Sequence, residues 1–112
     1  MSCRLFVYGT LAPGQTNHHL LQPLRGTWQR GWIQGTLYPD GIGQIRGYPV
    51  VDLERPAKRI DGYVLLSEDL PGRWAYLDAF EGPGYQRVRT RVHLDDEAVI
   101  EAWVYALDPH SL

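Results

Sequence analysis

Short apolar runs separated by glycine and proline turns follow one another along the chain and predict a fold built mainly from β-strands. The first run, Leu5–Tyr8, is rich in β-prone residues and stops at Gly9, which is typical of a buried strand that ends in a tight turn. Apolar and polar residues alternate raggedly over 28–38. We interpret this segment as a curved strand in which Gly31 and Gly35 mark bulges.

The other strand patterns occupy the middle and the end of the chain. Residues 39–49 are rich in glycine and proline and predict a surface loop, of the kind that often shapes the mouth of a pocket, before a short strand over 50–53. The alternation over 59–67 predicts a further strand. Apolar residues alternate with basic ones over 88–94, and residues 99–107 are rich in β-branched and aromatic side chains. These last two segments predict a hairpin.

Four apolar residues at spacings of four, three and three indicate one face of a helix: Leu70, Trp74, Leu77 and Phe80. This helix should end at about Glu81, because the sequence Gly82-Pro83-Gly84 cannot continue it. A second, short helix should begin at Thr16 or Asn17 and end before Pro23.

Strand patterns outnumber helical ones, and no alternation of strand with helix points to a parallel sheet. We therefore predict one α+β domain over residues 1–112. A sheet of about six short, glycine-rich strands can curl into a small barrel and so protect its edges. The expected architecture is a mainly antiparallel β-barrel with flanking helices.

Composition and charge exclude several classes of function. The 112 residues are 44% hydrophobic and 21% charged, with a net charge of −2 and no dense lysine or arginine block, so nucleic acid is not an expected partner. The single Cys3 cannot form an internal disulfide, and the first apolar run is too short for a signal peptide or a membrane span. These features predict a cytoplasmic protein that does not bind membranes.

The run Tyr8-Gly9-Thr10-Leu11 is the first candidate for chemistry. A strand that runs into a glycine turn leaves successive backbone amides unpaired and pointing together, and such a nest holds a carboxylate or a developing oxyanion. Gly9 would supply an unusual backbone angle, and Thr10 would add a hydroxyl donor. The alternative is an ordinary turn that only ends the strand.

Glu81 is the second candidate, because it stands at the end of the predicted helix beside apolar residues. Burial and the negative end of the helix dipole would both raise its carboxyl pKa toward neutrality, where proton transfer is useful. Asp78 lies one turn earlier and could share an edge of the same pocket. The alternative is that Glu81 is a solvated glutamate in the last helical turn.

No histidine pattern suggests a metal. His18 and His19 are adjacent, and adjacent helical side chains diverge by about 100°, so the pair is a poor chelate. His93 and His110 have no ligand spacing. We expect no bound metal.

Two motifs in this order resemble the γ-glutamyl cyclotransferase-like superfamily, and most closely its γ-glutamylamine cyclotransferase group. The run Phe6-Val7-Tyr8-Gly9-Thr10-Leu11 is similar to the opening strand and signature loop of these proteins. The segment with Leu77-Asp78, Phe80-Glu81 and Tyr85-Gln86-Arg87 is similar to the helix that carries their catalytic glutamate and to the strand behind it.

The resemblance implies a small β-barrel enzyme without a cofactor that cleaves a γ-glutamyl amide by attack of its own α-amine. The products would be 5-oxoproline and a free amine. Glu81 would be the general acid/base, and the expected substrate-binding residues are Tyr8, Gly9, Thr10, Leu11, Asp78 and Tyr85. The leaving amine stays open, and we expect a monomer or a weak homodimer. The alternative is a non-catalytic module that binds a small carboxylate or a peptide end in the same pocket.

Overall fold

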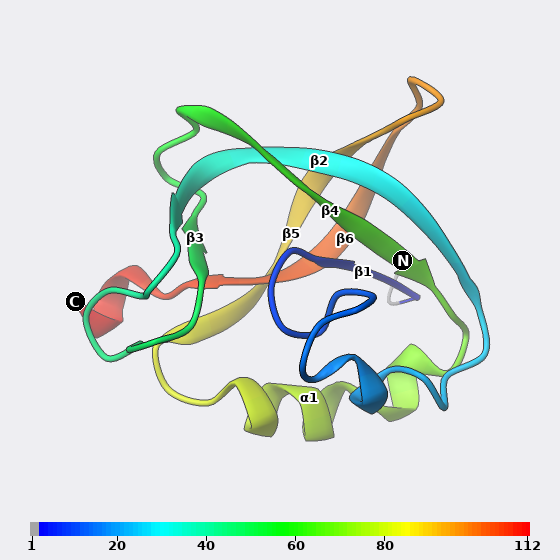
Figure 1. The fold of residues 1–112 in the computed structure, drawn as a ribbon, viewed down its shortest axis with the longest axis horizontal. Helices are drawn as coiled ribbons and strands as arrows, with labels where there is room; N and C mark the ends of the chain where they lie inside the picture. Colours follow the sequence, from blue (N-terminus) through cyan, green and yellow to red (C-terminus); the bar gives the residue numbers. More distant parts are fainter. Residues whose placement is uncertain (1–2) are drawn as a thin grey trace.

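The computed structural model describes residues 3–112 (Figure 1). Within this range the chain forms six strands, one α-helix and three short 3₁₀-helices. The strands are β1 (Arg4–Val7), β2 (Thr27–Tyr38), β3 (Val50–Asp52), β4 (Lys58–Leu66), β5 (Tyr85–Leu94) and β6 (Val99–Leu107). The helices are η1 (His18–Leu20), η2 (Leu70–Gly72), α1 (Trp74–Glu81) and η3 (Pro109–Ser111).

The strands form one sheet that closes on itself. Their order is β3-β2-β4-β1-β6-β5, and an additional pairing of β2 with β5 closes five of them into a barrel, with β3 attached to β2. Only β1 and β6 pair in parallel, and the other strand pairs described in residues 3–112 are antiparallel. The predicted α+β class and mainly antiparallel barrel are confirmed.

The barrel closes where β2 bends across β5, and glycine makes this approach possible. Gly31 pairs with Leu94 of β5, and a Cβ atom at Gly31 would lie 2.9 Å from the carbonyl oxygen of His93. The expected bulges at Gly31 and Gly35 do not occur, because β2 pairs with β4 residue by residue through both positions. At Gly31 the missing side chain therefore allows β2 to approach β5 closely, and it does not mark a bulge.

The predicted helix over 70–81 is interrupted. Residues Leu70–Gly72 form a 3₁₀ turn, and the α-helix begins at Trp74. Leu70, Trp74 and Leu77 are buried as the spacing predicts, but Phe80 is 40% exposed. Helix α1 lies across one end of the barrel (Figure 1). Within residues 3–112, no helix is long and apolar enough to cross a membrane.

Strand β1 is buried on both faces. Leu5 and Val7 pack into the cluster that contains Leu77 of α1, while Phe6 points to the opposite side and packs against Ile33 inside the barrel. The exposed fraction of Leu5, Phe6 and Val7 is 3% or less. A central strand of this kind fixes the position of the turn that follows it, because burial of each such side chain contributes about 1.5–3 kcal/mol.

Pro109–Ser111 form η3, whose first turn is capped by the Asp108 carboxylate accepting a hydrogen bond from the His110 backbone amide at 3.0 Å. Such a cap satisfies an amide that would otherwise lack a partner.

Candidate active site

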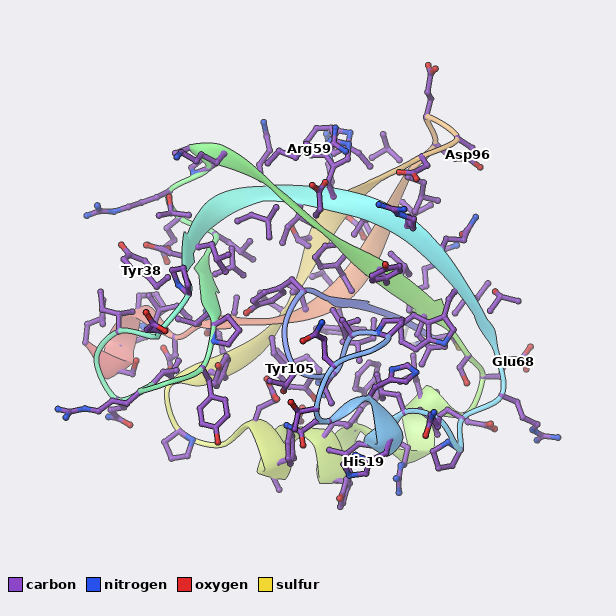
Figure 2. All side chains as sticks on the ribbon, in the orientation of Figure 1. His19, Tyr38, Arg59, Glu68, Asp96 and Tyr105 are labelled. Carbon is purple, nitrogen blue, oxygen red and sulfur yellow. The ribbon has the colours of Figure 1, made fainter. Side chains whose placement is uncertain are left out.

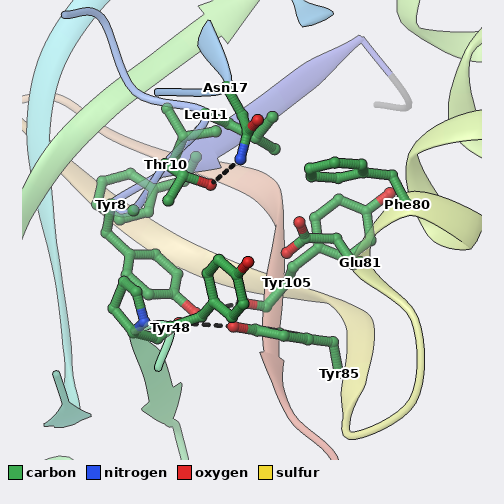
Figure 3. Close-up of a pocket in the computed structure, with 13 residues that line it drawn as sticks. Tyr8, Thr10, Leu11, Asn17, Tyr48, Phe80, Glu81, Tyr85 and Tyr105 are labelled. Carbon is green, nitrogen blue, oxygen red and sulfur yellow. Dashed lines mark hydrogen bonds between the residues drawn. The ribbon is translucent and has the colours of Figure 1, made fainter. Parts of the chain in front are cut away.

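A cavity of about 300 Å³ opens at the end of the barrel that α1 covers. Its walls come from the turn after β1, the loop before β3, the last residues of α1 and the face of β5 and β6 that is turned toward α1 (Figure 3). The lining residues are Phe6, Val7, Tyr8, Gly9, Thr10, Leu11, Asn17, Tyr48, Pro49, Phe80, Glu81, Tyr85 and Tyr105. Figure 2 shows Tyr105 inside the molecule, whereas Arg59, Glu68 and Asp96 lie on its outside.

Glu81, the last residue of α1, directs its carboxylate into the cavity between the rings of Phe80 and Tyr48 (Figure 3). No hydrogen-bond or ion-pair partner for this carboxylate lies among residues 3–112. Burial raises the pKa of Glu81 from 4.5 to about 7. At neutral pH the group is therefore present in both its protonated and its ionised form, as a proton-transfer catalyst requires.

The turn after β1 faces Glu81 across the cavity. Two backbone hydrogen bonds shape it: the amide of Ala12 donates to the Gly9 carbonyl at 3.0 Å, and the amide of Asn17 donates to the Thr10 carbonyl at 2.8 Å. The amides of Gly9, Thr10 and Leu11 donate to no acceptor in the part of the chain that the structure describes. Adjacent free amides of this kind are suited to an anion.

Gly9 is needed for a reason other than the expected one. Its φ angle is not in the left-handed region, so the turn does not depend on an unusual backbone angle. A Cβ atom at Gly9 would instead lie 3.1 Å from Cγ of Pro49, in the loop before β3. The glycine allows the turn and this loop to meet at the cavity wall.

Thr10 and Asn17 add side-chain donors beside the free amides. The Asn17 side-chain amide donates to Oγ1 of Thr10 at 3.0 Å (Figure 3). Because the Thr10 oxygen acts as the acceptor there, its own hydrogen remains able to donate to a bound ligand.

Four tyrosines line the cavity, and the hydroxyls of three of them, Tyr8, Tyr85 and Tyr105, are engaged in hydrogen bonds to other parts of the protein. The Tyr8 hydroxyl donates to the Tyr105 carbonyl at 2.6 Å and accepts from the Val51 amide at 3.1 Å. The Tyr85 hydroxyl donates to the Pro49 carbonyl at 2.7 Å, and burial raises the pKa of Tyr85 to about 12. Tyr85 therefore holds the loop with its hydroxyl and presents only its ring to the cavity.

Asp78 does not line the cavity. Its carboxylate accepts hydrogen bonds from Arg87 of β5, at 2.9 and 3.3 Å, and from the hydroxyl of Tyr105 of β6, at 2.6 Å. Burial acts to raise the pKa of Asp78. The hydrogen bonds from Arg87 and Tyr105 and the positive charge of Arg87 act in the opposite direction, and their combined effect lowers this pKa below its usual value. Asp78 is thus an ionised, paired carboxylate outside the cavity, with a side chain that is 44% exposed.

Comparison with known proteins places the chain in a family. The sequence profile described as "Gamma-glutamyl cyclotransferase, AIG2-like" matches residues 5–112, almost the whole chain. The chain belongs to this family. The resemblance inferred from the two motifs is confirmed.

Individual relatives support the family assignment. A Drosophila melanogaster protein named "Putative gamma-glutamylcyclotransferase" is 28% identical over an alignment of 113 positions, gaps included, that covers 96% of this chain and 71% of the relative. The crystal structure of Bacillus subtilis YkqA superimposes with a TM-score of 0.72 at 28% identity and covers 95% of this chain. The chain spans 36% of that longer protein. An AIG2-like protein of Mus musculus superimposes with a TM-score of 0.65 at 27% identity, covering 97% of this chain and 81% of the relative.

Seven of the residues that line the cavity were not predicted as site residues from the sequence: Phe6, Val7, Asn17, Tyr48, Pro49, Phe80 and Tyr105. Asn17 was interpreted only as a possible helix cap. Phe80 was assigned to the buried helical stripe, and Tyr48 lies in a loop without periodic pattern. Tyr105 had no distinguishing signal, because it continues the alternation of its strand.

Charge and metal ligands in the cavity are sparse. Of the residues that line it, Glu81 is the single acidic residue, and neither lysine nor arginine contributes to the lining described within residues 3–112. No group of three potential metal ligands occurs in that same range. An anionic substrate group would therefore meet neutral hydrogen-bond donors on the turn.

Proposed function

We propose that this chain is a γ-glutamyl cyclotransferase that releases an amine from a γ-glutamyl compound and forms 5-oxoproline. One observation carries the proposal: Glu81, an unpaired carboxyl with a pKa of about 7, lines the same small cavity as Gly9, Thr10 and Leu11, whose backbone amides donate to no acceptor in the described chain. A proton acceptor and an anion site on opposite walls are what cyclisation of a γ-glutamyl group needs.

The reaction begins with proton transfer to Glu81. The α-amine of the substrate is an ammonium at neutral pH, with a reference pKa of about 7.7–8.0 in peptides, and becomes nucleophilic after the Glu81 carboxylate takes one proton. The freed nitrogen attacks the γ-carbonyl carbon, and a C–N bond forms. The carbonyl oxygen becomes an oxyanion in a tetrahedral intermediate.

Collapse of this intermediate breaks the bond to the leaving nitrogen. Glu81 returns its proton to that nitrogen, and a second proton from the attacking nitrogen follows. One hydrogen of the original ammonium stays on the lactam nitrogen, and two end on the released amine. The step needs neither water nor an oxidant, because ring closure within one molecule supplies the nucleophile.

The turn after β1 would hold the anionic part of the substrate. The amides of Gly9, Thr10 and Leu11, with the Thr10 hydroxyl, would bind either the α-carboxylate or the oxyanion. We further propose that the reaction takes place in the cytoplasm, since the chain has one cysteine, Cys3, and it is a free thiol.

A screen for 5-oxoproline tests the proposal. The purified chain would be incubated with γ-glutamyl-ε-lysine, with γ-glutamyl amino acids and with γ-glutamyl amines that lack a second carboxylate. We expect 5-oxoproline from at least one of these classes and none from the Glu81→Gln variant. If no class yields 5-oxoproline from the wild-type chain at neutral pH, the proposed activity is wrong.

The second candidate is a binding module without catalysis. The free amides by themselves would bind a small carboxylate, which is the observation that favours it. Calorimetric binding of a γ-glutamyl compound with no release of 5-oxoproline would support this function. An unpaired Glu81 has no evident use in such a module, because a second carboxylate repels the ligand.

A further inference from the structure

The carboxylate of Asp78 joins three elements outside the cavity. Arg87 of β5 donates to it through Nε and Nη2, at 2.9 and 3.3 Å, in a two-point contact with both carboxylate oxygens. The hydroxyl of Tyr105, on β6, donates to the same group at 2.6 Å. Helix α1 is thereby tied to both strands of the β5–β6 hairpin. Two-point arginine pairs fix orientation as well as distance.

The guanidinium of Arg87 is itself held in place. Its central carbon lies 4.4 Å from the ring centre of Trp74 and 4.6 Å from that of Trp103. The two indoles meet edge to face, with ring centres 6.3 Å apart, and Arg87 occupies the wedge between them. Its side chain is 22% exposed. A planar, ring-stacked guanidinium loses few further conformations when it binds a carboxylate.

The contacts of Asp78 reach both halves of the site. Glu81 stands one helical turn after Asp78 on α1. Tyr105, which donates to Asp78, accepts a hydrogen bond from the Tyr8 hydroxyl through its carbonyl oxygen at 2.6 Å. Tyr8 begins the turn that carries the free amides. The same group of bonds therefore connects the acid/base carboxyl and the anion-binding turn.

Trp74 and Leu77 anchor α1 in the core, and beyond Leu77 the contacts of Asp78 are the ones that tie its last turn to the hairpin. The helix contains eight residues, its N-cap residue Arg73 makes no side-chain capping bond within the described chain, and Gly82 ends it with a φ of 72°. A helix of this length is unstable by itself and depends on tertiary contacts. Phe80 and Glu81 face the cavity and do not anchor it.

We propose that Arg87 is a positioning residue for Glu81: through the Asp78 carboxylate it fixes the last turn of α1 against the β5–β6 hairpin. Arg87 does not line the cavity and touches no substrate. Its importance for turnover rests on the proposed function, whereas its effect on Glu81 does not. The paired charge of Arg87 also cancels the charge of Asp78 one turn from Glu81.

The balance between the charges of Arg87 and Asp78 can be measured through the pKa of Glu81, because few other charges lie near this carboxyl. Tyr8, Tyr48, Tyr85 and Tyr105 line the cavity with Glu81, and the lining holds no other acidic residue and no lysine or arginine within the described chain. The nearest charges for which the structure gives contacts on α1 and β5 are those of Asp78 and Arg87. Removal of Arg87 leaves an anion one turn from Glu81, whereas removal of the Asp78 charge leaves a cation outside the cavity.

Carbon-13 NMR titration of the Glu81 carboxyl, assigned with Glu81→Gln, tests the proposal without any turnover. We expect Arg87→Gln to raise the Glu81 pKa and Asp78→Asn to lower it, each by about half a unit or more for charges at this separation. Arg87→Lys keeps the charge and loses the two-point contact. Because the lysine still balances the charge of Asp78, Arg87→Lys should leave the Glu81 pKa within about 0.3 units of the wild-type value.

Turnover of an accepted γ-glutamyl compound gives the second readout. Arg87→Lys should lower kcat about tenfold with little change in KM, because a misplaced base affects the reaction more than binding. Arg89→Gln is the matched control: Arg89 stacks on Trp103 at 5.3 Å and has no carboxylate partner among the described residues. It should leave both pKa and kcat unchanged.

The outcomes separate this proposal from the proposed function. Equal Glu81 pKa values in wild type, Arg87→Gln and Asp78→Asn would overturn the positioning role, even if 5-oxoproline is released. Opposite pKa shifts without any 5-oxoproline would support the positioning role and count against the cyclotransferase. If Arg87→Gln does not fold by thermal melting, Asp78→Asn and Arg87→Lys decide the question: no pKa shift in the first and wild-type kcat in the second would overturn it.

Discussion

Helix α1 presents two carboxyl groups, one turn apart, to two different surroundings. On the side of the β5–β6 hairpin, Asp78 is held by Arg87 and Tyr105, and its pKa is lowered. On the side of the cavity, Glu81 has no partner within the described residues, and burial raises its pKa to about 7. The chemical groups are nearly identical. Hydrogen-bond partners keep one carboxyl ionised at neutral pH, whereas burial without a partner gives the other a pKa suited to its proposed role in proton transfer.

The two carboxyl groups also differ in what they contribute to the stability of the fold. The paired carboxylate fastens the helix to the barrel and does not reach the cavity. The unpaired one lies in the cavity and has no hydrogen-bond partner among the described residues to offset its burial, so it lowers the stability of the fold. In the proposed reaction, one short helix would thus carry one carboxyl that stabilises the fold and one that transfers protons.

The same amide replacement at the two positions should give the largest difference. Glu81→Gln keeps the size of the side chain but cannot accept a proton, so we expect 5-oxoproline release to fall by about 10²–10⁴-fold. Asp78→Asn keeps the acceptor for Tyr105 and should retain at least about a tenth of wild-type turnover. Steady-state assays on a substrate that the wild type accepts would measure both, and thermal melting would verify folding. A Glu81→Gln variant with more than about a tenth of wild-type turnover would show that Glu81 is not the base.

The second prediction concerns stability against pH. Because the folded-state pKa of Glu81 lies above its unfolded value of 4.5, the folded chain binds more protons between pH 4.5 and about 7 and loses stability as pH rises through this window. Glu81→Gln removes the loss. At pH 8 the variant should be more stable than wild type by about 2 kcal/mol, less than the full shift implies because the carboxyl is partly exposed.

Urea unfolding at pH 4 and pH 8 would measure this effect, and the two proteins should have equal stability at pH 4. Asp78→Asn is the matched control. Because the folded-state pKa of Asp78 is lowered, its stabilising effect is present at pH 8 and is lost as pH falls through that lowered pKa. This variant should therefore lose stability at pH 8. An equal response of the two variants to pH would refute the distinction between paired and unpaired carboxyls.

A third change would place another carboxylate opposite Glu81. Asn17→Asp introduces a negative charge beside the Thr10 hydroxyl, on the wall where the substrate's anionic group would bind. Like-charge repulsion should raise KM about tenfold or more. Asn17→Ala, which loses only the hydrogen bond to Thr10, should raise it less. If the two variants had the same KM, the anion would bind elsewhere.

The smallest expected effect is that of Tyr85→Phe. It removes the hydrogen bond from the Tyr85 hydroxyl to the Pro49 carbonyl and keeps the ring that lines the cavity. The loss of one such bond, about 1 kcal/mol, should lower kcat/KM about fivefold and speed hydrogen exchange in residues 39–49. Unchanged exchange with lowered kcat/KM would indicate that the hydroxyl binds substrate directly.

Sequence patterns predicted the barrel well because most strands combine alternation with a glycine or proline boundary. The extent of β6, Val99–Leu107, was predicted to the residue, whereas β5 begins at Tyr85, three residues before its alternation becomes clear. Periodicity also found the buried residues Leu70, Trp74 and Leu77. It did not find the break near Gly72, because 3₁₀ and α turns repeat at nearly the same spacing.

The sequence predicted candidate-site residues where a chemically suited side chain or turn stands next to a glycine or proline that ends an element. Glu81 before a Gly-Pro-Gly sequence, and the turn that begins at Tyr8, line one cavity although they lie far apart in the chain. Tertiary contacts decide the rest. Tyr48 enters the cavity because Ile45, three residues earlier, is buried against Val50 and anchors the loop. No local pattern reports such an anchor.

The parallel pairing of β1 with β6 has a consequence for how the chain is made. Tyr8 emerges early from the ribosome, yet its hydroxyl bonds to the carbonyl of Tyr105, 97 positions later. Until β6 is synthesised, one edge of β1 has no strand to pair with and is open to association with other chains. Contacts of such high sequence separation also slow folding. We therefore expect a nascent chain halted before β6 to depend on chaperones and to hold no working cavity.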